Sequence, residues 1–189
     1  MATTSYATRV TPETYLVRER AARERSEYWD GEVVAMSGAP EPHVLITGNV
    51  FATLRARLRG RDCRVYASDM KVRFDEGRAT AYPDVVAVRG ERRWADGRRD
   101  VLLNPTLVVE VLSPSTERHD RGRKTEGYRR VESLAEYLFI AQKDPRVELY
   151  RRGAEGEWSL AVFTGMNDEV WLESLGCALR LPEIYEDVE

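Results

Sequence analysis

A continuous apolar run, LVVEVL at 107–112, contains a single carboxylate, Glu110. Runs of β-branched and aliphatic residues of this length are typical of strands that are covered on both faces. A carboxylate in such a strand loses favourable hydration unless a cation or a proton compensates. The run therefore predicts a sheet with layers on both sides. It leaves two explanations for Glu110: a core ion pair with an arginine, or membership of a polar site.

The pattern along the rest of the chain predicts a mixed α/β domain. Thr11 and Pro12 begin a first helix over 11–25, Asp30-Gly31 forms the turn of a hairpin over 26–36, and a second helix runs from His43 to Leu58. One mixed strand is expected at 63–74, a strand–helix–strand crossover at 107–141, and antiparallel strands from there to the C-terminus. The fold class is a mixed sheet flanked by helices, with additional C-terminal strands.

Length and composition fit one domain over residues 1–189. No apolar stretch approaches the ~20 residues of a membrane span, and the N-terminus lacks the order of a secretory signal. Cys63 and Cys177 are therefore expected to be reduced thiols of a cytoplasmic protein.

The net charge of the chain and the charge of its individual segments point in different directions. The net charge of −3 argues against a protein that coats nucleic acid through its overall field. Residues 118–130 nevertheless carry six Lys or Arg against two acids, which is either a solvated face or a nucleic-acid contact. The chain has 26 Arg and only three Lys, so each lysine hints that a compact ammonium is needed at its position.

Two carboxylates begin or interrupt neighbouring apolar strands. Asp84 opens the strand DVVAV, and Glu110 lies 26 residues later, which suits two adjacent strands and a connection. Hard cations such as Mg²⁺ take carboxylate oxygens together with water and substrate phosphate. Taken alone, Asp84 is better explained as a turn residue or a cap at the start of a strand.

The phrases YPD, LVVEVLSPST, HDRGRKTEGY and EYLFI resemble the Uma-type restriction endonuclease family of the PD-(D/E)XK nuclease superfamily. The resemblance covers roughly residues 13–165 and includes EYWDGEVVAMSGAPEPH near the front. It implies a restriction-endonuclease-like fold and Mg²⁺-dependent hydrolysis of DNA, with Mn²⁺ as a substitute metal. It also implies that Asp84 and Glu110 bind the metal.

The superfamily lysine, two residues after the glutamate, is absent because Leu112 occupies that position. The resemblance implies that the lysine has moved to the following helix, where Lys124 matches. Asp120, Lys124, Tyr128 and Val131 have the spacing of one helix face, which would carry Lys124 toward the sheet. The alternative is an exposed Asp120–Lys124 pair.

Other candidates are accessory. Glu32 and His43 match the front of the family pattern, and each is equally explained as a solvated hairpin residue or a helix-start residue. The basic stretch offers four nucleic-acid contacts, with core packing an equal alternative for the tyrosine: Arg121, Arg123, Tyr128 and Arg129. Asp69 and Lys71 are expected at the surface, and His119 in solvent.

The leading interpretation is a metal-dependent endodeoxyribonuclease in which Asp84, Glu110 and Lys124 are catalytic. The alternatives are an inactive nucleic-acid-binding or regulatory module on the same fold, and an enzyme acting on another phosphorylated substrate. The expected partner is DNA, without a membrane. A homodimer remains open, since two-fold symmetry suits cleavage of both strands.

Overall fold

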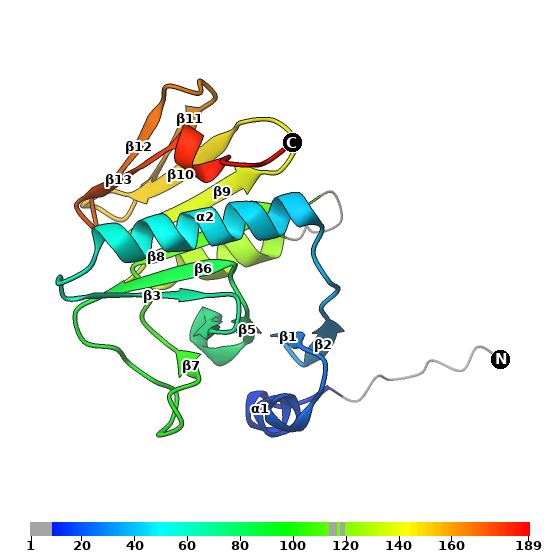
Figure 1. Cartoon of the computed structure of the whole chain (residues 1–189). Helices are drawn as coiled ribbons and strands as arrows, with labels where there is room; N and C mark the ends of the chain where they lie inside the picture. The colour runs from blue at the N-terminus through cyan, green and yellow to red at the C-terminus, as the bar shows by residue number, and fades with distance from the viewer. Residues whose placement is uncertain (1–8, 114–116, 118–119) are drawn as a thin grey trace.

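A computed structural model describes residues 9–113, 117 and 120–189 and has a mixed α/β fold (Figure 1). The helical elements are α1 (Pro12–Ala21), α2 (Glu41–Arg57), the 3₁₀ turn η1 (Asp75–Gly77), the π-helical turn η2 (Asp120–Lys124), α4 (Thr125–Arg129) and α5 (Leu181–Ile184). The strands are β1 (Ser26–Trp29), β2 (Glu32–Ala35), β3 (Cys63–Ala67), β4 (Lys71–Phe74), β5 (Ala79–Ala81), β6 (Val85–Arg89), β7 (Val101–Leu102), β8 (Leu107–Leu112), β9 (Glu136–Ala141), β10 (Val147–Arg152), β11 (Trp158–Phe163), β12 (Glu169–Leu172) and β13 (Cys177–Arg180).

The larger sheet has six strands in the order β11-β10-β9-β8-β6-β3. Every residue of β8 is buried, as the unbroken apolar run predicts for a strand covered on both faces. Helix α2 runs across one face of this sheet (Figure 1), and its buried side chains Ile46, Val50 and Leu54 join the core formed with β6, β8 and β9. The C-terminal pair β12–β13 and α5 complete that core.

The opposite face of the six-stranded sheet packs against a second, five-stranded sheet of order β2-β1-β5-β4-β7. Its first hairpin turns at Asp30 and Gly31, whose φ angles of 48° and 94° are those of a type I′ turn. The Asp-Gly turn expected from the sequence is therefore present. The core between the two sheets is rich in aromatic side chains, among them Trp29, Phe74, Tyr128, Tyr137 and Phe139.

The connection from β8 to β9 contains η2 and α4. β8 and β9 are parallel neighbours, with Leu107 opposite Glu136 and Leu112 opposite Ala141, so the strand–helix–strand prediction is correct. Within the described residues, the helical segment from Asp120 onward consists of the π-helical turn η2 and the short helix α4, and it ends at Arg129, earlier than expected. Val131 therefore lies beyond α4 instead of on its face, although it still packs against the core between the sheets.

Three boundaries differ from the sequence-based expectations. The segment 63–74 is two strands, β3 and β4, which belong to different sheets because the chain turns at 68–70. α1 ends at Ala21, before 25, and α2 begins two residues before His43. Thr11 caps α1 as expected, accepting a hydrogen bond from the Thr14 N–H.

In the part of the chain that is described, no helix has the length and apolar character required to cross a membrane. Cys63 and Cys177 are both free and buried.

Candidate active site

One edge of the six-stranded sheet gathers the polar side chains. β8 and β9 are parallel, so their carboxyl ends meet at this edge, and β6 is antiparallel to β8, so its first residue also lies there. Val85, the first residue of β6, pairs with Val109, so Asp84 directly precedes β6 beside the end of β8 that carries Glu110. The two carboxylates predicted from the sequence therefore come from adjoining segments at one end of the sheet, close enough for the charge of Asp84 to help raise the pKa of Glu110.

Asp84 is held through both of its oxygens. Its Oδ1 lies 2.7 Å from His43 Nε2, and its Oδ2 accepts a 2.7 Å hydrogen bond from the Val111 N–H. His43 lies in the first turn of α2, so the beginning of this helix lies at the same end of the sheet as Asp84. The side chains of Asp84 and His43 retain 15% and 16% exposure, so this half of the site is open to solvent.

Glu110 points into a buried cluster around Lys124. Lys124 Nζ lies 3.1 Å from Glu110 Oε1, 3.1 Å from Glu27 Oε1 and 3.2 Å from Asp120 Oδ1. All four side chains are at most 10% exposed. The contact to Glu110 is an ion pair without an aligned hydrogen bond, since Glu110 Oε1 has no hydrogen-bond partner. Three carboxylates therefore share one ammonium away from water.

Burial and the neighbouring charges shift the pKa values of Glu110 and Lys124. Burial raises the pKa of Glu110 well above its ordinary value; the Lys124 ammonium opposes the rise, and the carboxylates of Asp120, Asp84 and Glu27 add to it. For Lys124, burial lowers the pKa, but the charges of Glu110, Glu27 and Asp120 outweigh burial and raise the pKa well above its ordinary value. Lys124 thus remains an ammonium, while Glu110 favours a proton unless further positive charge is supplied.

The aromatic side chains beside the cluster are also kept neutral. Burial, and then the charge of Glu110, raise the pKa of Tyr128 and of Tyr137 well above the ordinary value. The Tyr128 ring is fully buried and stacks on Phe74 with ring centroids 4.0 Å apart. Tyr128 as a nucleic-acid contact is accordingly wrong for this conformation, and core packing is its role.

The accessory carboxylate and its arginine lie outside the buried cluster. Glu32 is exposed on β2, and its Oε2 lies 3.6 Å from Arg123 Nη1. The Arg123 guanidinium sits 5.6 Å from the Trp29 ring and is about half exposed. Among the basic candidates, Arg123 is thus accessible and close to the site.

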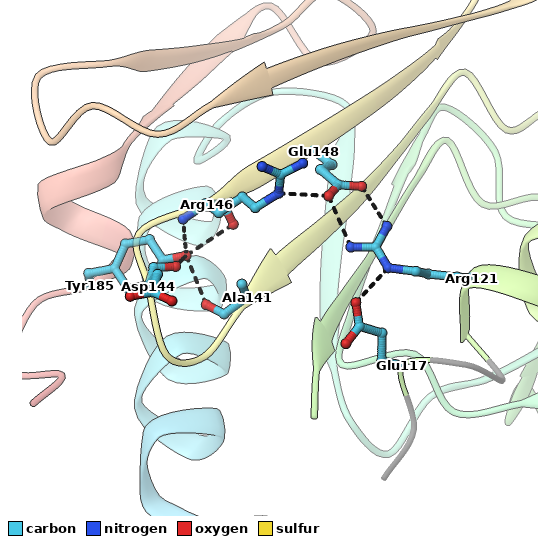
Figure 2. Close-up of polar contacts among 7 residues, drawn as sticks. All are labelled: Glu117, Arg121, Ala141, Asp144, Arg146, Glu148 and Tyr185. Carbon is cyan, nitrogen blue, oxygen red and sulfur yellow. Dashed lines mark hydrogen bonds and ion pairs between the residues drawn. The ribbon is translucent and has the colours of Figure 1, made fainter. Parts of the chain in front are cut away.

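The other two arginines have structural partners. Arg121 makes a bidentate pair with the buried Glu148 and a further hydrogen bond to Glu117, as Figure 2 shows. The Arg129 guanidinium lies 5.1 Å from the Tyr150 ring and 5.9 Å from the Trp158 ring. These contacts explain both residues without a nucleic acid.

Lys71 was expected at the surface, and this is wrong. Its side chain is buried, with Nζ 3.2 Å from Asp100 Oδ2 and 5.4 Å from the Tyr82 ring, because β4 is an inner strand of the second sheet. Asp69 is exposed as expected and pairs with Arg25. His119 lies outside the described residues.

Two residues of the site were not predicted from the sequence. Glu27 contributes the second carboxylate to Lys124; its signal is the alternation of β1, which places it on the same face as the buried Trp29. Gln142, whose Nε2 lies 3.1 Å from His43 Nδ1, directly follows β9. A polar residue at the carboxyl end of a strand parallel to β8 was the available signal.

The donor chemistry of this edge suits a hard divalent cation. Among the described residues, no three carboxylate, imidazole or thiol groups are arranged to hold a metal together. Mg²⁺, however, is commonly held by one or two carboxylates and completes its shell with water and phosphate oxygens. Asp84 and Glu110 would supply two such carboxylates, and Glu110 Oε1, which has an ion pair with Lys124 but no hydrogen bond, is a buried acceptor for a cation.

Comparison with known proteins identifies the family. A family model described as "Uma2: Putative restriction endonuclease" matches residues 12–182. The chain belongs to the Uma2 family. The match extends beyond the 13–165 segment expected from the sequence motifs and takes in β12 and β13.

Two Synechocystis proteins are similar to this Uma2 chain along most of its length. The uncharacterized protein sll1609 is 35% identical over 156 residues, which are 82% of this chain and 88% of that protein. The uncharacterized protein slr1290 is 33% identical over 177 residues, which are 94% of this chain and 92% of that protein.

A solved structure shares the fold. It is a crystal structure described as a "putative nuclease belonging to DUF820" from Anabaena variabilis, and it superposes with a TM-score of 0.75 over 93% of this chain and 97% of that one, at 16% identity. The restriction-endonuclease-like mixed α/β fold predicted from the sequence is confirmed.

Proposed function

We propose that this Uma2 protein is a Mg²⁺-dependent endonuclease that hydrolyses phosphodiester bonds in DNA. The observation that carries the proposal is that Asp84 bonds the segment of β8 that carries Glu110: Asp84 Oδ2 accepts a 2.7 Å hydrogen bond from the Val111 N–H, and Lys124 Nζ lies 3.1 Å from Glu110 Oε1. Nucleases of this fold are generally metal-dependent, and Mn²⁺ would substitute for Mg²⁺.

Asp84 and Glu110 would hold the cation, which when bound activates water and stabilises charge on the phosphate. His43 and the Val111 N–H keep the Asp84 carboxylate in one orientation. With a cation bound, Glu110 would be held as a carboxylate, because the positive charge would offset the burial that raises its pKa.

Lys124 stays positively charged throughout, so it acts through charge and not as a base. It is surrounded by three carboxylates. A cation at Glu110 would weaken one of these ion pairs and free a donor of the ammonium. We propose that this donor orients the attacking water or stabilises the negative charge that develops on the phosphate.

An inactive nucleic-acid-binding module on the same fold is the second candidate. It is favoured by the position of the lysine, which stands on η2 within a closed set of ion pairs, while Leu112 occupies its superfamily place on β8. In that case Arg123, exposed beside Glu32, would contact the phosphate backbone without cleavage.

The test is cleavage of supercoiled plasmid DNA by the purified protein with Mg²⁺, with Mn²⁺ and with EDTA. We expect cleavage with either metal, none with EDTA, and a loss of at least about 100-fold in Asp84→Asn and Glu110→Gln, as for removal of a single transition-state contact. Lys143→Met, which changes an exposed lysine in the β9–β10 turn, is the matched control and should cleave normally.

Equal cleavage by wild type and both carboxylate variants would contradict the proposal. DNA binding without cleavage in either metal would favour the inactive module instead.

The cell compartment and the oligomeric state are further parts of the proposal. The two free, buried cysteines suit a reducing compartment, and we propose a cytoplasmic protein. A two-fold homodimer would place two such sites on one duplex. β2 and β11 end their sheets, and each carries exposed apolar side chains that a second copy would cover.

A further inference from the structure

Two further side chains, Gln142 and His43, form a line of hydrogen-bond contacts that ends at Asp84. We infer that Gln142 is a positioning residue: through His43, it holds the Asp84 carboxylate in the orientation in which it meets the cation. The inference rests on the proposed function for its purpose, but its geometry stands independently.

The chain of contacts fixes the imidazole at both nitrogens. His43 Nε2 lies 2.7 Å from Asp84 Oδ1, and His43 Nδ1 lies 3.1 Å from Gln142 Nε2. An ionised Asp84 can only accept, so Nε2 must carry a proton. In the neutral ring Nδ1 is then an acceptor, and the amide N–H₂ of Gln142 is the group that can donate to it. The requirements at the two ends of the ring agree.

Gln142 is itself held in place by the C-terminal segment. It sits in the turn between β9 and β10, where Tyr185 Oη accepts a 2.9 Å hydrogen bond from the Arg146 N–H and donates a 2.8 Å bond to the Ala141 carbonyl (Figure 2). Burial raises the pKa of Tyr185 to about 12, so the hydroxyl keeps the proton that it donates. The turn is thereby braced on both sides of Gln142, whose side chain is buried.

The contacts from Gln142 to His43 and from His43 to Asp84 are hydrogen bonds, which fix the orientation of each group in a way that apolar packing does not. Ligand-orienting partners of this kind typically change metal affinity by about 10- to 100-fold when removed. The other oxygen of Asp84 is already held by the Val111 N–H, so the ring controls the remaining freedom of the carboxylate.

The sequence makes the test unusually direct. Gln142 is the only glutamine of the chain, and His43 is one of two histidines. In ¹⁵N-labelled protein, long-range ¹⁵N–¹H spectra report the ring tautomer, and a His119→Asn variant separates the two rings. We expect His43 as the neutral tautomer with its proton on Nε2, and slow exchange of that proton with water.

Gln142→Met keeps the length of the side chain and removes the donor; Gln142→Leu is a second variant should the first fold poorly. We expect the Nε2 proton of His43 to exchange at least about tenfold faster and Mg²⁺ affinity by calorimetry to fall about 10- to 100-fold. Lys143→Met, in the same turn, should match wild type in both measurements.

A proton on Nδ1 in the wild type, or exchange and Mg²⁺ affinity in the Gln142 variants within about twofold of wild type, overturns the inference. Absence of Mg²⁺ binding by the wild-type protein would instead count against the proposed function, and the ring measurements would still decide whether Gln142 holds His43.

Discussion

Glu110 is the residue on which the chemistry of the site depends, because its burial and its charge oppose each other. It is almost completely buried on β8, and the nearest positive charge, Lys124, is shared with Glu27 and Asp120. The cluster therefore has more negative than positive groups. A site of this kind is unfavourable for stability and suited to binding a cation.

Lys124→Met tests how strongly the cluster depends on its ammonium. The substitution removes the ammonium that three buried carboxylates share, and removal of one member of a buried ion pair typically lowers the free energy of unfolding by about 3–5 kcal/mol. Urea denaturation followed by tryptophan fluorescence measures the change. Lys143→Met should stay within about 0.5 kcal/mol of wild type, as for an ordinary surface substitution.

If Lys124→Met unfolds at the same urea concentration as wild type, the ammonium does not hold the cluster together.

At the scale of elements, α4 packs closely against β4: Gly127 lies against the Phe74 ring, on which Tyr128 stacks. A Cβ added to Gly127 would lie 2.6 Å from Cε2 of Phe74, whose ring is stacked on Tyr128. Gly122, in the π-helical turn before α4, has open space around it. The two glycines of this segment therefore have different roles.

Gly127→Ala should lower the free energy of unfolding by about 1–3 kcal/mol, because overpacking outweighs the higher helix propensity of alanine. Gly122→Ala is the matched control and should be neutral or stabilising by up to about 1 kcal/mol. Thermal unfolding of both variants measures the difference. A Gly127→Ala protein as stable as the Gly122→Ala protein would show that α4 can move away from β4.

The elements also show what the sequence could and could not predict. The apolar run of β8, the Asp-Gly turn and the β8–β9 crossover have strong local signals, and all three were predicted. The division of 63–74 between two sheets has no local signal, since it depends on long-range pairing. Glu27 and Gln142 also have no strong local signal. Glu27 reaches the site through the pairing of β1 in the second sheet, and Gln142 through the turn after β9.

At the scale of the whole molecule, the raised pKa of Glu110 links stability, pH and metal. The folded chain keeps a proton on Glu110 that the unfolded chain loses above pH ~4.3. The contribution of this group to stability is thus full below that value and falls as pH rises toward the folded pKa. A cation competes with the proton, so its stabilising effect should grow over the same range.

We therefore expect excess MgCl₂ to raise the melting temperature more at about pH 8 than at about pH 5. Glu110→Gln cannot ionise, so it should lose this pH-dependent increment while its fold persists. Differential scanning calorimetry measures both proteins. A metal-induced increment of equal size at the two pH values would contradict the linkage.

In the proposed site Asp84 and Glu110 jointly hold the metal, and anomalous scattering from a crystal soaked in Mn²⁺ measures this directly. We predict one anomalous peak between the two carboxylates, with oxygen ligands from both and with Lys124 still beside Glu110. A crystal without a peak at this edge of the sheet, or with a peak that contacts neither carboxylate, would contradict the account.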